Sequence, residues 1–233
     1  MDLKDGDLHI WRYSLNGQDY RTEKESPVLS KEEQNRYNAY INESDKIRYI
    51  GNHRFVRQVL SKYLNILPAQ VQFSQTAMGK PYVENSGLFF NYSYRGDFGI
   101  LALSRNEEVG VDIEKMRILQ DIPTFTEFCF SEKEKQIIFK SDKEKFQETL
   151  FIFWTFKEAI IKSLGVGLNV DISEIDLSDF FYKELNALAY DGGNAYTIKN
   201  IDAPQGFMAA FAMKGKVSNY TEFNYSERLF FQG

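Results

Sequence analysis

The sequence predicts an α+β fold built from two similar halves that share an interface. The predicted elements run in the order strand, helices, strands, and this order starts again near residue 112, although no residue-level repeat accompanies it. At 233 residues the chain has room for two units of about 110 residues, each able to bury a core. We therefore predict halves at residues 1–111 and 112–226, and we treat residues 227–233 as a disordered tail or an expression-tag remnant.

The elements of the first half follow from capping and periodicity. Ser30 and Glu33 form a capping box, in which each side chain bonds the backbone N–H of the other residue, so a helix of about a dozen residues should follow. Apolar residues recur at helical spacing over 44–64 with basic residues between them, which predicts a second helix with a cationic face. Residues 79–82 (Gly-Lys-Pro-Tyr) predict a turn. Strands are expected at 8–15, 88–94 and 98–104.

The second half is expected to begin with a strand at 109–114. A second capping box, Ser131 with Glu134, predicts the start of a helix. A longer helix is expected from about residue 143 to residue 164, with Gly165 as its stop. Closing strands are expected at 172–177, 195–201 and 207–213. Ligand sites tend to form in the cleft between two such halves.

The sequence contains two acidic patterns, at residues 110–114 (Gly-Val-Asp-Ile-Glu) and 154–162 (Trp-Thr-Phe-Lys-Glu-Ala-Ile-Ile-Lys). The predicted elements put them on opposite sides of this interface. In an extended strand Asp112 and Glu114 point to the same face, because side chains alternate with a period of two. In a helix Trp154, Glu158 and Lys162 lie on one stripe, because residues four apart are neighbours on the helix surface. One element therefore offers two carboxylates, and the other offers a third beside a cation.

Three carboxylates a few ångströms apart need a neutralising cation. One like-charge pair at 4 Å costs about 4 kcal/mol at an effective dielectric near 20. An all-oxygen ligand set suits Mg²⁺, and Lys162 would then contact the same phosphate group. Taken singly, each motif is more often a solvated polar edge or a surface ion pair. The metal interpretation is favoured because Asp112 and Glu114 follow an apolar strand and Glu158 has apolar neighbours, where an unpaired charge is costly.

Composition limits the partners and the compartment. The net charge of −5 argues against a nucleic-acid partner. Residues 46–62 are locally basic, which fits a bound phosphate and fits a solvated helix face equally well. The lone Cys129 fits a reducing cytoplasm, and no segment resembles a signal peptide or a membrane span. We therefore expect a cytoplasmic protein without a membrane partner and, because two halves in one chain can complete a site, a monomer.

The acidic patterns also carry a resemblance. Residues 110–114, together with 153–165 (Phe-Trp-Thr-Phe-Lys-Glu-Ala-Ile-Ile-Lys-Ser-Leu-Gly), resemble the surfactin-type 4′-phosphopantetheinyl transferases. Residues 79–82 and 91–93 (Asn-Tyr-Ser) lie where that family carries its Gly-Lys-Pro and Asn-x-Ser segments. Four motifs in the right order cover about residues 30 to 170.

The resemblance implies a pseudo-two-fold fold with the active site between the halves. It also implies a transferase that moves the phosphopantetheine arm of coenzyme A to a serine of an acyl or peptidyl carrier protein, releasing adenosine 3′,5′-bisphosphate. In this family the positions of Asp112, Glu114 and Glu158 hold Mg²⁺ against the coenzyme A pyrophosphate. The positions expected on coenzyme A itself are Arg48, Arg54, Lys80, Ser93 and Lys162.

Asp112, Glu158 and Lys162 are the expected catalytic residues. Attack of a serine hydroxyl on the pyrophosphate builds charge on the leaving phosphate, which Mg²⁺ and Lys162 would stabilise. The serine must also lose its proton, and Glu158 is either the general base or only a metal ligand. The sequence does not say which carrier protein accepts the group.

One departure from the family pattern bears on coenzyme binding. The family usually has a histidine after the Asn-x-Ser serine, and here Tyr94 and Arg95 follow. A tyrosine with a pKa of about 10 stays a neutral phenol, so Arg95 is expected to supply the missing charge and the coenzyme to bind more weakly or differently. Two alternatives stay open: a module that binds coenzyme A or a carrier protein without turnover, and a Mg²⁺-dependent phosphohydrolase.

Overall fold

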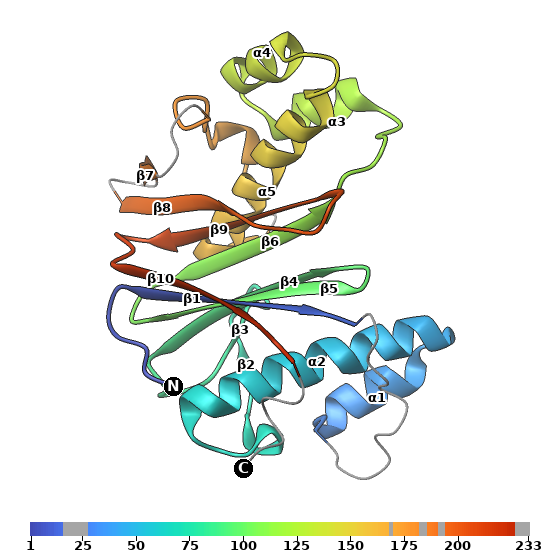
Figure 1. Cartoon of the computed structure of the whole chain (residues 1–233), viewed down its shortest axis with the longest axis vertical. Helices are drawn as coiled ribbons and strands as arrows, with labels where there is room; N and C mark the ends of the chain where they lie inside the picture. The colour runs from blue at the N-terminus through green and yellow to red at the C-terminus, as the bar shows by residue number, and fades with distance from the viewer. Residues whose placement is uncertain (16–27, 168–169, 182–185, 191–193, 227–233) are drawn as a thin grey trace.

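The protein forms four layers, with helices outside and two four-stranded sheets between them (Figure 1). The computed structural model describes residues 1–15, 28–167, 170–181, 186–190 and 194–226. One apolar core lies between the two sheets, and each sheet also packs on its own helices through a further core. No helix within the described ranges is both long enough and apolar enough to cross a bilayer.

The lower sheet has the strand order β10-β1-β5-β4, in which β1 runs parallel to β10 and antiparallel to β5, and β5 runs antiparallel to β4. Helix α2 covers its outer face, and α1 lies beside α2 (Figure 1). The elements are β1 Asp7–Ser14, β4 Leu88–Arg95, β5 Phe98–Arg105, β10 Asn219–Asn224, α1 Lys31–Ala39 and α2 Glu43–Leu64. A short 3₁₀ helix at Pro68–Gln70 and the small hairpin of β2 (Ser74–Gln75) and β3 (Pro81–Tyr82) lie between α2 and β4 in the chain.

The upper sheet has the strand order β6-β9-β8-β7 and is antiparallel throughout. Along β9, Phe211 and Met213 pack between the two sheets, while Ala210 and Ala212 pack toward α5, as the period of two in a strand requires. The elements are β6 Val109–Lys115, β7 Asn186–Tyr190, β8 Asn194–Ile201, β9 Phe207–Lys214, α3 Ile122–Cys129, α4 Glu132–Lys140 and α5 Phe146–Leu164.

Most of the predicted elements are confirmed, including both capping boxes and Gly165, which ends α5 with a φ of +67°. The strand predicted at 172–177 is wrong, because this segment begins with a short 3₁₀ helix at Ile172–Glu174. Buried side chains take its backbone groups: Lys157 Nζ donates to Ile172 O at 2.9 Å, and Leu177 N donates to Glu134 Oε1 at 2.9 Å. Helix α3 and strands β7 and β10 were not predicted, and the predicted tail at 227–233 lies outside the described residues.

Strand β10 returns from the upper sheet to the lower sheet. Its residues follow the upper sheet in sequence, yet they pair with β1 in the lower sheet, from Asp7 opposite Asn219 to Arg12 opposite Asn224. The predicted boundary between residues 111 and 112 falls inside β6. The division into two halves therefore stays a prediction.

Glu33 ties α1 to α2 through buried hydrogen bonds. Its Oε1 lies 2.9 Å from His53 Nδ1, and its Oε2 accepts from Arg57 Nε at 3.0 Å and from Ser30 N at 2.6 Å. Arg57 is itself buried, and its guanidinium also donates to Val71 O at 2.6 Å. Burial alone would raise the pKa of Glu33, but the bonds from His53 and Ser30 and the charge of Arg57 hold that pKa at about 2.

Replacing Glu33 should therefore lower the free energy of unfolding at neutral pH and make that free energy less dependent on pH in the acid range. The pKa of this carboxyl group is about 2 in the folded protein, against 4.5 for a glutamate side chain free in water. Its contribution, about 3 kcal/mol, is present above about pH 4.5 and is lost as the pH falls through about 2. We expect Glu33→Gln, which keeps the capping box, to lower the free energy of unfolding by about that amount at pH 7 and less toward pH 2. Urea unfolding between pH 2 and 7 measures this; the exposed Glu43→Gln serves as control, and parallel pH curves for wild type and Glu33→Gln would contradict the prediction.

Candidate active site

Strands β4 and β6 form the floor of the candidate site. Each lies at the edge of its sheet, and the two edges are joined by side chains. Asn91 Oδ1 accepts from Val111 N at 2.9 Å, and Ser93 Oγ donates to Asp112 Oδ1 at 3.0 Å. Asn91 and Ser93 are two residues apart on β4 and so share the face toward β6. The seam between the two sheets therefore places a serine hydroxyl on a buried carboxylate.

Helix α5 brings a lysine to the same carboxylate. Lys162 Nζ donates to Asp112 Oδ1 at 2.5 Å and to Ser93 Oγ at 3.1 Å. The helix can approach β6 this closely because position 110 is glycine: a Cβ there would lie 2.0 Å from Ala159 O and 2.3 Å from Ser163 N. Gly110 thus sets the distance between the strand that carries Asp112 and the helix that carries Lys162.

Substituting Gly110 should separate the two elements. The added methyl group of Gly110→Ala meets backbone atoms of α5, which no side-chain movement can relieve. We expect a loss of about 3 kcal/mol or more in the free energy of unfolding and a displaced α5. As a control, the new Cβ of Gly206→Ala has no described residue within 4 Å, and its positive φ should cost only about 1 kcal/mol. Urea unfolding of both variants measures the difference, and equal losses would contradict the contact assigned to Gly110.

Asp112 is the carboxylate of the site whose surroundings best suit a bound cation. The residue is 3% exposed, and its Oδ1 accepts both the serine and the lysine bonds. Its Oδ2 is buried and, among the described residues, has no hydrogen-bond partner. A buried carboxylate oxygen without a partner is costly, so this atom is suited to a bound cation.

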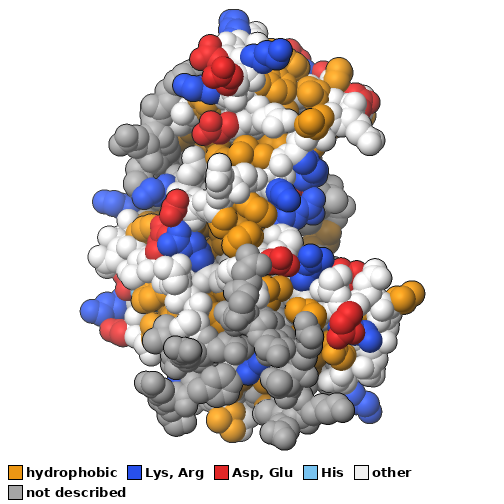
Figure 2. All heavy atoms as spheres, turned by 45° about the vertical axis from the view of Figure 1, so that its right-hand side comes forward, with side chains coloured by type: hydrophobic (Ala, Val, Ile, Leu, Met, Phe, Trp, Pro, Cys, Tyr) orange, Lys and Arg blue, Asp and Glu red, His pale blue; other side chains and the backbone are white. Residues whose placement is uncertain are grey.

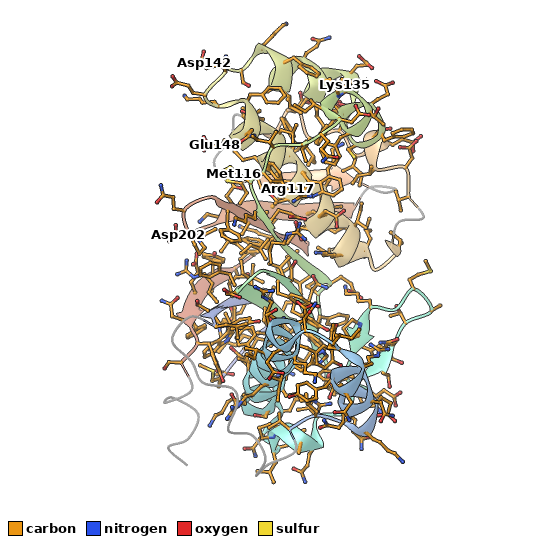
Figure 3. All side chains as sticks on the ribbon, turned by 90° about the vertical axis from the view of Figure 1, so that its right-hand side faces the viewer. Met116, Arg117, Lys135, Asp142, Glu148 and Asp202 are labelled. Atoms are coloured by element: carbon orange, nitrogen blue, oxygen red, sulfur yellow. The ribbon has the colours of Figure 1, made fainter. Side chains whose placement is uncertain are left out.

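The two other predicted carboxylates, Glu114 and Glu158, lie close enough to Asp112 for their charges to interact. Burial raises the pKa of Glu158, Lys162 lowers it, and the charges of Asp112 and Glu114 raise it further. Glu114 Oε2 is paired with Arg95 Nε at 3.3 Å and with Arg117 NH1 at 3.1 Å. Figure 3 shows Arg117 beside α5, on the seam side of Lys135 and Asp142. Figure 2 shows charged side chains of both signs where the outline of the molecule is hollowed at mid-height.

Asp112 and Glu114 are each paired with cations. Within the described part of the chain, no three His, Cys, Asp or Glu side chains come close enough together to hold a metal ion. Asp112 is paired with Lys162, and Glu114 with two arginines. The oxygen donors and the unpartnered Asp112 Oδ2 nevertheless fit a hard cation. Binding of Mg²⁺ by Asp112, Glu114 and Glu158 therefore stays a prediction.

The other predicted coenzyme residues have contacts of their own. Arg48 Nε pairs with Asp97 Oδ1 at 3.0 Å, and Arg54 is buried within α2. Lys80 Nζ pairs with Glu108 Oε2 at 2.5 Å. Tyr94 is 47% exposed and, next to Ser93 on β4, points to the opposite face of the strand, with its ring parallel to that of Tyr92. Their roles in coenzyme binding stay predictions.

Some residues of the site were not singled out by sequence reasoning. Asn91 lies within a recognised motif, but its bond to Val111 N depends on the contact between the two sheets. Arg117 lies three residues after Glu114, and this short spacing is the feature of the sequence that could have indicated their ion pair. Glu108 and Ser163 flank the two acidic patterns, and their importance depends on the packing of α5 on β6.

Comparison with known proteins agrees with this geometry. A model of the 4′-phosphopantetheinyl transferase superfamily matches residues 108–214, and a model described as 4′-phosphopantetheinyl transferase, N-terminal, matches residues 19–106. The 4′-phosphopantetheinyl transferase HetI of Nostoc sp. is 27% identical over 182 residues, which cover 76% of each chain. The 4′-phosphopantetheinyl transferase gsp of Aneurinibacillus migulanus is 31% identical over 148 residues, 64% of this chain and 61% of that protein.

A distant likeness to a solved structure was also found. A holo-(acyl-carrier-protein) synthase from Bacillus anthracis, in complex with CoA, matches 47% of this chain and 96% of that chain with a TM-score of 0.35 and 17% identity, too remote to bear on the site. Both family matches describe a 4′-phosphopantetheinyl transferase, which defines the class of enzyme. The chain belongs to the 4′-phosphopantetheinyl transferase superfamily, which confirms the resemblance drawn from its motifs.

Proposed function

We propose that this chain transfers the 4′-phosphopantetheine group of coenzyme A to a serine of an acyl or peptidyl carrier protein in the presence of Mg²⁺. The observation that carries the proposal is the cluster of Lys162, Ser93 and Asp112 at the seam between the sheets. An ammonium group and a hydroxyl beside a buried carboxylate, one oxygen of which has no partner in the described part of the chain, can accommodate a phosphate and its cation. Family membership supports the same reaction.

The residues have distinct tasks in this reaction. Lys162 Nζ and Ser93 Oγ would donate to phosphate oxygens of coenzyme A and stabilise the charge that develops there. Asp112, Glu114 and Glu158 would hold Mg²⁺, which supplies further positive charge against the pyrophosphate. The carrier serine oxygen forms a bond to the phosphorus that bears the pantetheine arm, and the bond from that phosphorus to the bridging oxygen breaks. Adenosine 3′,5′-bisphosphate leaves with that oxygen.

The proton of the carrier serine needs an acceptor. Burial raises the pKa of Glu158, and we propose this carboxylate as the proton acceptor if it is not itself a ligand of Mg²⁺. Arg95 lies two residues after Ser93 on β4 and pairs with Glu114, so it is the proposed source of the positive charge that a histidine supplies elsewhere in the family. We also propose that the enzyme works as a monomer in the cytoplasm, where its single Cys129 would stay reduced.

Mass spectrometry tests the proposal directly. The chain is incubated with coenzyme A, Mg²⁺ and each of several apo carrier proteins, and the mass of the carrier is followed. A gain of one phosphopantetheine group is expected. Free phosphate or nucleotide without that gain would indicate a phosphohydrolase, and binding of coenzyme A without either product would indicate a module that lacks turnover.

A further inference from the structure

Lys80 forms a clamp between the end of α5 and the start of β6. Its Nζ donates to Glu108 Oε2 at 2.5 Å, to Ser163 O at 2.9 Å and to Val109 O at 3.3 Å. An ammonium group has three N–H donors, and all three are used here. The side chain is only 12% exposed. We call Lys80, Glu108 and Ser163 the lysine clamp.

The clamp holds groups that adjoin the candidate active site. Ser163 follows Lys162, and its carbonyl is among the last of α5, which have no partner within the helix. A cation at this end of a helix also interacts favourably with the helix dipole. Ser163 Oγ donates to Glu108 O at 3.2 Å and so joins the helix end to the start of β6 a second time. Val109, the third partner, lies on β6 three residues before Asp112.

The surroundings of Lys80 are poorly suited to a phosphate. An incoming anion would have to displace three acceptors and would meet the carboxylate of Glu108. The stem of Lys80 lies close to Gly165 at the end of α5, because a Cβ added there would be 3.1 Å from Lys80 Cδ. Burial lowers the pKa of Lys80, while the bond to Glu108 acts in the opposite direction.

We propose that Lys80 is a positioning residue, which acts through Ser163 and Glu108 to hold Lys162 against Asp112, and that it does not bind the coenzyme. The inference rests on the proposed function, because Lys162 must take part in catalysis for its position to matter. It assigns the lysine of the Gly-Lys-Pro segment to the alignment of α5 and β6.

The test compares turnover with coenzyme binding. Lys80→Met keeps an unbranched apolar stem and removes all three donors. We expect kcat to fall about 10- to 100-fold, because a displacement of about 1 Å at a reacting group is enough for such a loss. In a Lys162→Met background, adding Lys80→Met should change the Kd of coenzyme A with Mg²⁺, measured by calorimetry, less than about twofold, because the group through which Lys80 acts is already gone. Weaker binding of coenzyme A by tenfold or more with an unchanged kcat would overturn the proposal.

A second background separates positioning from general stability. In a Lys162→Met protein there is no ammonium group left to position, so adding Lys80→Met should lower kcat no further. If Lys80 acted only on stability, the same fold-loss in kcat would appear in both backgrounds, and the proposal would be wrong. Glu108→Gln, which keeps the shape of the side chain, should give a smaller fall in kcat of the same kind, and it serves if Lys80→Met does not fold.

Failure of the clamp can be told from failure of the proposed function. Urea unfolding of Lys80→Met, Glu108→Gln and the double variant forms a double-mutant cycle that needs no activity. If the two substitutions are strongly coupled in unfolding but the protein has no transferase activity, the contact between Lys80 and Glu108 is supported and the proposed reaction is wrong. Additive effects on unfolding, together with an unchanged kcat in an active enzyme, would reject the clamp and leave the reaction in place.

Discussion

Glu158→Gln is expected to reduce phosphopantetheine transfer by about 1,000-fold or more while leaving the protein folded. Glutamine keeps the shape of the side chain but can neither accept the proton of the carrier serine nor supply an ionised oxygen to Mg²⁺. The charge of Glu158 is opposed by burial and by Asp112 and Glu114, so its removal should not harm the fold. The mass gain of the carrier protein measures transfer, and the thermal unfolding midpoint measures folding.

A matched control lies on the same helix. Glu148 is exposed in the first turn of α5, and Figure 3 shows it on the side of the molecule away from the seam. Glu148→Gln should therefore retain normal transfer. Retained turnover in Glu158→Gln would exclude both a general base and an essential metal ligand at this position.

The concentration of Mg²⁺ separates the two roles of Glu158. If this residue is only a ligand, Glu158→Gln should bind Mg²⁺ more weakly, and a large excess of Mg²⁺ should restore part of the activity. If it is the general base, added Mg²⁺ should have no such effect, because the proton still lacks an acceptor. The magnesium dependence of the residual rate distinguishes these outcomes.

The sequence predicted the features of the site that depend on local periodicity. Asp112 shares a strand with Glu114, and Glu158 shares a helical stripe with Lys162, so periods of two and 3.6 residues place each pair. The motif resemblance then joined the strand to the helix. The bond between Lys162 and Asp112 confirms that the two elements meet.

Features that depend on the crossing of distant segments could not be predicted in this way. The backbone of α5 lies close to Gly110 because α5 crosses β6, and the residues around position 110 do not predict this approach. The three acceptors of Lys80 come from two segments that follow it by 28 to 83 residues. The segment at 172–177 has a strand-like composition, but its backbone groups are taken by buried side chains instead of a neighbouring strand.

Glu134→Gln is expected to lower the free energy of unfolding by about 3 to 5 kcal/mol, because it leaves the buried ammonium group of Lys157 without its counter-ion. Lys157 Nζ lies 2.7 Å from Glu134 Oε2, and both side chains are 0% exposed. Burial lowers the pKa of Lys157 and raises that of Glu134, so each ion is stable there only beside the other. Glutamine keeps the shape of the side chain, but its single acceptor oxygen cannot accept from both Ser131 N and Leu177 N, so the variant also loses one of these hydrogen bonds.

A second substitution should reverse the part of this loss that comes from the unpaired charge. In Glu134→Gln/Lys157→Met the unpaired charge is gone, and an apolar side chain of similar length fills its place beside Phe130, whose ring centre lies 5.4 Å from Lys157 Nζ. Urea unfolding of both variants measures the recovery, and a double variant no more stable than Glu134→Gln would contradict the explanation. Lys157 immediately precedes Glu158, so this buried pair also fixes the rotation of α5 that turns Glu158 and Lys162 toward β6.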